Sequence, residues 1–147
     1  MSPDPSVIEF IKNHHVLTLA TCAGEVPYCS NMFYALLENE FCLVFTSSGD
    51  TRHIAEASQN PIVAGSIVLE TEITGKIQGL QFCGKMIKVS GKLKTKAIAT
   101  YLKRFPYAVL SGTPIRIIEI TYAKFTDNRL GFGKKIIWEK SPEAFRL

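Results

Sequence analysis

Hydrophobic residues recur at every second position in several stretches of this chain, which is the pattern of β-strands with one buried face. The stretches that predict strands, either by this alternation or by runs of apolar and β-branched residues, are residues 16–21, 28–37, 41–46, 62–70, 77–89 and 115–125. Polar turn residues separate the first three, so these predict a meander of neighbouring antiparallel strands. Because the six strands do not alternate regularly with helices, they predict a mainly β fold, an antiparallel barrel with helices on its outside.

Three other segments carry helical patterns. Residues 5–13 and 94–105 place apolar side chains three and four positions apart, as amphipathic helices do. A shorter helix is expected to end just before Pro61, where proline stops it. Within the fifth strand, Gly79 and Gly84 predict bends or bulges.

The composition is that of one globular unit. Of the 147 residues, 46% are hydrophobic, so we predict a single domain over residues 1–147. No apolar run approaches the ~20 residues that span a bilayer. The first residues also lack the basic and apolar parts of a secretion signal. We therefore expect a cytoplasmic protein with no membrane partner.

Cysteines and charges narrow the chemistry further. The four cysteines show no Cys-x-x-Cys spacing, so they predict buried free thiols and no metal site. The formal net charge of +4 is concentrated in the lysines of residues 85–104. Aromatic residues that would stack on bases are missing there, so a solvated face is expected and no nucleic-acid partner. A nucleic-acid-binding barrel stays an alternative hypothesis.

The densest group of polar residues lies in residues 44–61, where a buried strand passes through a hydroxyl-rich turn into a short helix. The hydroxyl and basic side chains of this turn are Thr46, Ser47, Ser48, Thr51, Arg52 and His53. A helix N-terminus offers unpaired N–H groups and a partial positive charge, so these side chains around it suit a phosphate. The alternative is an ordinary capped helix, with Asp50 or Thr51 as the cap.

A second group of polar and aromatic residues lies in the tail, residues 124–138. It holds two glycines, several basic residues and the only tryptophan, Trp138. One interpretation is an Asp-Asn turn, a glycine-rich loop and a final edge strand anchored by Trp138. The other is a mobile, positively charged loop beside an exposed aromatic ring, which suits a planar ligand with a phosphate.

Taken in order, these segments resemble the FMN-binding split barrel of the pyridoxamine 5'-phosphate oxidase superfamily. The resemblance rests on VFTSSGDTRHIAEASQNP at residues 44–61 and IQGLQFCGKM at residues 77–86, and it covers about residues 7 to 139. The tail, KFTDNRLGFGKKIIW, further resembles a small branch of that superfamily. The resemblance implies a six-stranded antiparallel split β-barrel with flanking helices, FMN as the cofactor, and a homodimer with flavins at its interface.

The resemblance also implies which residues contact the flavin. They are Ser30, Asn31, Met32, Phe33, Thr46, Ser47, Thr51, Arg52, His53, Gln81, Lys134 and Trp138. Thr51, Arg52 and His53 match the phosphate-binding positions of the family. Gln81, or else Gln78, matches a glutamine that contacts the flavin, usually across the dimer interface.

By the same matching, Thr46 and Ser47 would lie near the ribityl chain or the edge of the flavin ring. Residues 30–33 would flank the isoalloxazine. Trp138, with Lys134 or the lysine after it, would close the site.

The resulting hypothesis is an FMN-dependent oxidoreductase of unknown substrate, a homodimer that binds flavin and a small molecule. His53 stands where the family has a lysine, and an imidazole is largely neutral at pH 7. The arginine- and histidine-bearing C-terminal segment of the oxidase is missing, so vitamin B6 oxidation is not expected. The alternative is a non-catalytic barrel that binds haem or another cofactor, with His14, His15 and His53 as candidate axial ligands.

Overall fold

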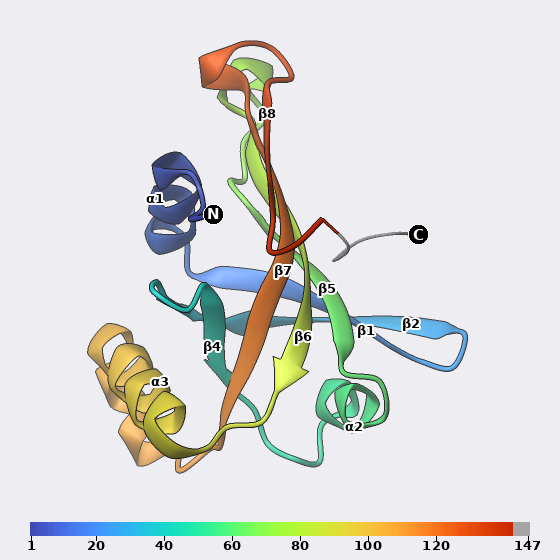
Figure 1. Cartoon of the computed structure of the whole chain (residues 1–147), viewed down its shortest axis with the longest axis vertical. Coiled ribbons are helices and arrows are strands. Elements are labelled where there is room, and N and C mark those ends of the chain that lie inside the picture. The colour runs from blue at the N-terminus through green and yellow to red at the C-terminus, as the bar shows by residue number, and fades with distance from the viewer. Residues whose placement is uncertain (143–147) are drawn as a thin grey trace.

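The structure of the protein, a computed structural model, describes residues 1–142. Its largest part is one antiparallel sheet that curls into a half-barrel (Figure 1). The strands are β1 Val16–Ala23, β2 Val26–Phe33, β3 Ala35–Leu37, β4 Cys42–Thr46, β5 Ile62–Val68, β6 Gln78–Ile87, β7 Ile115–Asp127 and β8 Lys135–Glu139. Their order is β2-β1-β5-β6-β7-β4-β3, and β8 pairs with β7. The mainly β, antiparallel architecture is confirmed, with eight strands in place of the expected six.

Part of this difference arises because the strand expected at residues 28–37 is two strands. Tyr34 interrupts it: its backbone N–H donates to the His15 carbonyl (3.1 Å) and its hydroxyl donates to the Ile11 carbonyl (2.7 Å). Before Tyr34 the chain pairs with β1, and after it with β4. Since β2 and β3 are consecutive in the chain but end the strand order at opposite edges, the sheet has to curl until these edges meet.

Three α-helices and three short 3₁₀ helices lie around the sheet. They are α1 Pro5–Asn13, α2 Arg52–Gln59, α3 Gly91–Arg104, η1 Thr74–Lys76, η2 Pro106–Leu110 and η3 Asn128–Leu130. α1 has the expected bounds, whereas α3 begins earlier, at Gly91. In Figure 1, α1 and α3 lie on one side of the curled sheet and α2 lies near the lower end of β5. None of the helices in the described part of the chain is long and apolar enough to cross a membrane.

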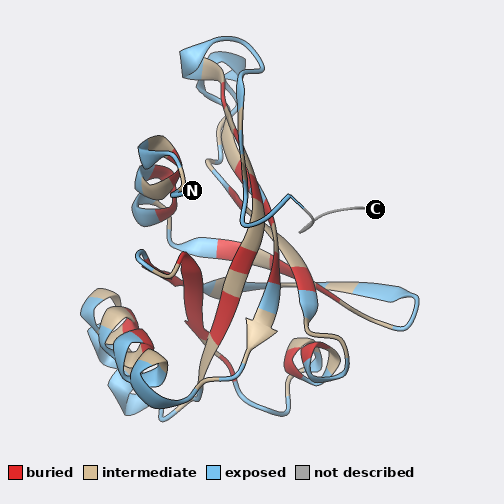
Figure 2. Ribbon diagram, in the orientation of Figure 1, coloured by how far each residue is buried: buried red, intermediate tan, exposed pale blue. Residues whose placement is uncertain are grey.

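The hydrophobic core fills the inside of the curled sheet and continues under α3 (Figure 2). β4 is buried on both faces, since alternate residues belong to different clusters. Leu43 and Phe45 face the barrel interior, while Val44 packs in a second cluster with Ala97 and Tyr101 of α3. This double burial explains why residues 41–46 form an almost unbroken apolar run.

β6 contains one bulge, between Cys83 and Gly84. A Cβ atom on Gly84 would lie 2.6 Å from the Glu119 carbonyl oxygen and 2.8 Å from Cγ2 of Ile118. The bend predicted at Gly84 is therefore confirmed, and it brings the backbones of β6 and β7 close together. At Gly79 the pairing with β7 is regular, so no bulge forms there.

The four cysteines are free thiols, but they are not all buried as expected. Cys42 is buried, and burial together with the charges of nearby acidic residues raises its pKa to about 11. Cys29 is exposed on β2, because alternate residues of this edge strand face away from the core. Among residues 1–142, no group of three His, Cys, Asp or Glu side chains could hold a metal ion.

Candidate functional site

The turn from β4 into α2 is the centre of the candidate site. Thr51 occupies the N-cap position, but its hydroxyl donates back to the Ser48 carbonyl (2.9 Å). Asp50, the other predicted cap, accepts a hydrogen bond from the Ser48 hydroxyl instead. Within the described chain, no side chain caps the first N–H groups of α2, which leaves them available to an anion.

His53 turns back from α2 onto this loop. Its Nε2 lies 2.7 Å from the Ser47 hydroxyl and 3.3 Å from the Thr51 hydroxyl, and its ring lies near that of Phe45. Burial, with a smaller contribution from the positive charge of Arg116, lowers the pKa of His53 below its ordinary 6.5. The imidazole is therefore neutral at pH 7. Its Nδ1 has no hydrogen-bond partner among residues 1–142.

Arg116, on β7, is a member of this group that the sequence did not reveal. β4 pairs with β7, and Arg116 lies opposite Phe45 in the register. Its Nε donates to the Ser47 carbonyl (3.1 Å), and its guanidinium lies beside Gly49. Nothing in the local pattern of residues 115–125 indicates that this strand pairs with β4, so the sequence carried no signal for it. We call Ser47, Thr51, Arg52, His53 and Arg116 the α2 cluster.

Arg52 is already engaged by neighbouring side chains. Its Nε donates to Oε1 of Glu56 (2.9 Å), and its guanidinium carbon lies 4.3 Å from the centroid of the Tyr28 ring. Glu56 also accepts from the Thr21 hydroxyl (2.6 Å). This hydrogen bond and the one from Arg52 lower the pKa of Glu56, which keeps it ionised. A phosphate at Arg52 would therefore compete with a carboxylate.

The four β2 residues predicted to flank a flavin ring lie on two different faces of the sheet. Ser30 and Met32 face the interior, since they pair with the buried Leu19 and Leu17 of β1. The Ser30 hydroxyl is buried and has no hydrogen-bond partner among the described residues. Asn31 and Phe33 alternate with them and face outward. A single ligand on one face of the sheet can therefore contact Ser30 and Met32, or Asn31 and Phe33, but not all four residues.

Gln81 belongs to a row of polar side chains across the outer face of the sheet. By the strand register, the row comprises Asn31, Thr18, Ser66, Gln81 and Lys124. Thr18 donates its hydroxyl proton to Asn31 Oδ1 (2.8 Å). The adjoining positions hold small or apolar residues, among them Ala20, Ala64, Cys83 and Val68. Asn31 and Gln81 therefore lie in the same row on this face, and no residue of the α2 cluster belongs to that row.

Three further predicted residues lie away from the α2 cluster within one chain. Trp138 stacks edge-on against Phe41 (4.6 Å between centroids) and donates its Nε1 proton to the Met1 carbonyl (2.8 Å). Lys134 lies in the turn before β8, at the end of the sheet opposite α2 (Figure 1). Thr46 donates its hydroxyl proton to the Tyr101 hydroxyl (3.3 Å), beneath α3. The edge-strand interpretation of the tail is the one that the structure bears out.

Comparison with known sequences identifies relatives along nearly the whole chain. A UPF0306 protein of Photorhabdus laumondii is 38% identical over 131 residues, which cover 89% of this chain and 92% of that protein. No model of a protein family matches the chain.

Comparison with solved structures identifies the fold. A haem-binding protein from Mycobacterium smegmatis has a TM-score of 0.75 and 18% identity, over 95% of this chain. The chain spans 59% of that protein's length. HutZ, a haem storage protein from Vibrio cholerae, has a TM-score of 0.65 and 18% identity, over 95% of both chains. These similarities confirm the split-barrel fold that the resemblance implied; FMN binding stays a prediction.

Proposed function

The chain belongs to the UPF0306 family, and we propose that it is a non-catalytic binding protein for a planar, anionic cofactor, with haem ahead of FMN. The observation that carries the proposal is the α2 cluster. A partly buried histidine is held neutral there by burial and by the positive charge of Arg116. The residues of the cluster come from β4, α2 and β7, so the folded barrel positions all of them.

The α2 cluster fits haem in two respects. A metal-ligating imidazole has to be neutral, and His53 has a lowered pKa and a ring nitrogen without a partner among residues 1–142. Arginine guanidinium groups bind carboxylates in fork geometry, so Arg116 would hold one propionate. Arg52 would hold the other by exchanging its hydrogen bond to Glu56 for one to the ligand. When bound, haem would supply an iron that a neutral imidazole could ligate.

The other two histidines fit this role less well. The pKa of His14 is also lowered, by burial, His15 and Arg104, but its ring packs on Phe10 (4.2 Å between centroids). Both histidines precede β1, on the side of α3, and neither adjoins the α2 cluster. The solved neighbours named for haem binding and haem storage support the ligand class but not the choice of histidine.

The second candidate function is an FMN-dependent oxidoreductase. The uncapped N–H groups of α2 and the hydroxyls of Ser47 and Thr51 favour it, because such groups bind phosphates. Arg52 shares its charge with Glu56, and a neutral His53 replaces the expected lysine, so the phosphate meets less positive charge. The pairing of Arg52 with Glu56 weakens the contact of any anion there, whereas a neutral His53 favours an iron over a phosphate, and this difference places FMN second.

We expect a Soret band when haemin is added to the purified protein. The His53→Ala variant should bind haemin at least about tenfold more weakly, because the loss of an iron ligand should cost more than about 1.4 kcal/mol of binding free energy. Binding by the wild type should also weaken as the pH falls through the lowered pKa of His53, because a protonated imidazole cannot ligate iron. Absorbance titrations between neutral and mildly acidic pH measure both effects.

The matched control is His15→Ala, which removes an exposed imidazole outside the α2 cluster. Equal affinity of the His53→Ala variant and the wild type for haemin would contradict the assignment of His53. A wild type that quenches FMN fluorescence but gives no Soret band would replace the first candidate function with the second.

We also propose that a second copy of the chain covers the outer face of the sheet. Val68 (66% exposed) and Ile62 (59% exposed) flank the polar row there, and interfaces of homodimers combine apolar surface with a few polar contacts. Ser66→Arg, at the centre of the row, should convert a dimer of twice 16.3 kDa into a monomer in sedimentation velocity. Ile73→Arg, at an exposed position before η1, is the control. A wild type that sediments as a monomer would exclude the dimer.

A further inference from the structure

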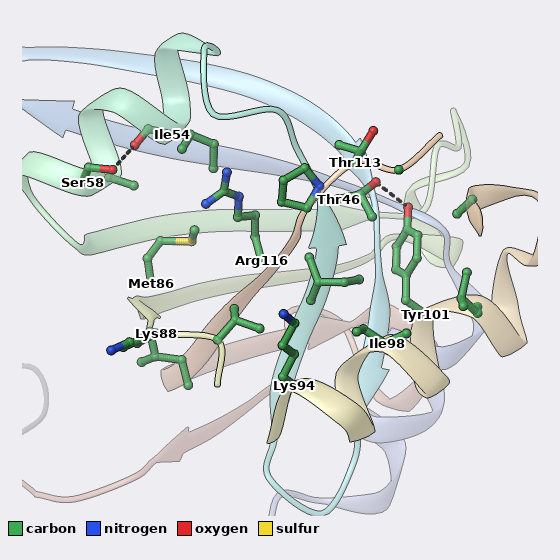
Figure 3. Close-up of a pocket in the computed structure, with 18 of the residues that line it drawn as sticks. Thr46, Ile54, Ser58, Met86, Lys88, Lys94, Ile98, Tyr101, Thr113 and Arg116 are labelled. Atoms are coloured by element: carbon green, nitrogen blue, oxygen red, sulfur yellow. Dashed lines mark hydrogen bonds between the residues drawn. The ribbon is translucent and has the colours of Figure 1, made fainter. Parts of the chain in front are cut away.

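A separate cleft of about 860 Å³ lies between α2, α3, the end of β6 and the start of β7 (Figure 3). This volume is within the roughly 300–1,000 Å³ of cavities that hold small molecules. Of the α2 cluster, only Arg116 lines the cleft, and His53 is not part of its wall. It is a candidate site distinct from the one proposed for the cofactor.

The walls of the cleft are mostly aliphatic. Ile54 comes from α2, Met86 from the end of β6, Ile98 from α3 and Ile115 from β7. Among residues 1–142, Tyr101 is the only aromatic residue that lines the cleft, and its hydroxyl accepts a hydrogen bond from Thr46. A planar ring would therefore find no stacking partner along most of the surface, whereas a flexible hydrocarbon chain would contact all four walls.

The polar groups of the cleft carry positive charge. Arg116 and Lys94 project into the space from β7 and α3, and Lys88 lies at the rim and points outward (Figure 3). Arg116 uses its Nε on the Ser47 carbonyl, which leaves the terminal nitrogens of its guanidinium free for a ligand. Within residues 1–142, no carboxylate pairs with these three cations, and no Asp or Glu lines the cleft.

The mouth of the cleft adds exposed apolar surface. Val109, on η2, lines the cleft and is 65% exposed. Because Val109 is apolar and exposed, a hydrocarbon chain bound in the cleft would keep apolar contacts as far as the rim.

We propose that this cleft binds a medium-chain aliphatic carboxylate, with its hydrocarbon chain along Met86 and Ile98 and its carboxylate at Arg116. The aliphatic walls select the chain, and the unpaired guanidinium selects the negative head group. The inference goes beyond the proposed cofactor site, because apart from Arg116 it uses different residues and a different chemical class of ligand.

Isothermal titration with decanoate tests the proposal. Decanoate should bind roughly tenfold more tightly than octanoate, since two additional methylenes are buried. Decyltrimethylammonium, which has the same chain and the opposite charge, should show no measurable binding. Val109→Glu should weaken decanoate binding by about tenfold or more, because a carboxylate at the rim repels the ligand.

Two matched controls separate a local effect from a general one. Lys94→Glu should weaken binding by roughly fivefold, and Lys92→Glu, an exposed position on α3 outside the lining, should not. Leu110→Glu is the corresponding control for Val109→Glu. Equal affinity for decanoate and decyltrimethylammonium, or wild-type affinity in the Val109→Glu variant, would overturn the proposal. Haemin binding is measured separately by absorbance, so either inference can fail without the other.

Discussion

Replacing Gly84 with alanine should lower the free energy of unfolding by about 3 kcal/mol, the upper part of the usual range for overpacking. The new methyl group would meet a backbone oxygen, that of Glu119, at 2.6 Å, and Cγ2 of Ile118 at 2.8 Å. The backbone of β7 cannot yield as a side chain would, so β6 and β7 would have to separate at the bulge. The melting temperature should fall by roughly 10 °C in a protein of this size.

Gly79→Ala is the matched control on the same strand. A Cβ there would meet only the Ile67 carbonyl oxygen, at 3.8 Å, which is an ordinary contact. Its unfolding free energy in urea should stay within about 0.5 kcal/mol of the wild type. Equal destabilisation by the two substitutions would show that the cost comes from losing a strand glycine in general and not from the close approach at Gly84.

The bulge at Gly84 also matters for the cleft. It precedes Met86, which forms one wall of the cleft, and the register shift sets which face of the strand Met86 occupies. A Gly84→Ala variant that folds should therefore bind decanoate more weakly. The same variant should leave the α2 cluster intact, because its residues come from β4, α2 and the first residues of β7.

Much of the fold could be predicted because its signals are local. The bounds of α1, the start of β5 after Pro61 and the bend at Gly84 each depend on residues close together in sequence. The break at Tyr34 was missed because nothing local marks it. It depends on two hydrogen bonds to carbonyls of α1 and of the segment that follows it.

The candidate site was predictable only in part, for the same reason. The turn of residues 46–53 carries its hydroxyl and basic side chains in one continuous segment, so the sequence indicates a binding site there. Arg116 reaches that turn only because β4 pairs with β7 across a long separation in the chain. The resemblance likewise grouped Trp138 with the site, whereas within one chain Trp138 packs on Phe41.

Replacing Arg104 with methionine should lower the free energy of unfolding by about 3–4 kcal/mol, because it removes several hydrogen bonds from a charged group. The guanidinium donates to the carbonyls of Tyr34 (3.1 Å), Lys12 (3.0 Å) and His14. Tyr34 is fully buried, so its carbonyl would be left without a replacement donor from water. Arg104, at the end of α3, thus connects α3 by hydrogen bonds to the end of α1 and to the β2–β3 junction, where the two edges of the sheet meet.

Two further variants separate the hydrogen bonds of Arg104 from its charge. Arg104→Lys keeps the charge but cannot reach three carbonyls in fork geometry, so it should recover less than half of the lost stability. Lys103→Met removes a neighbouring, exposed charge from α3 and should change the unfolding free energy by less than about 0.5 kcal/mol. Urea unfolding curves measure all three. Full recovery in Arg104→Lys would mean that the positive charge near the C-terminus of α1, and not the hydrogen-bonded fork, closes the half-barrel.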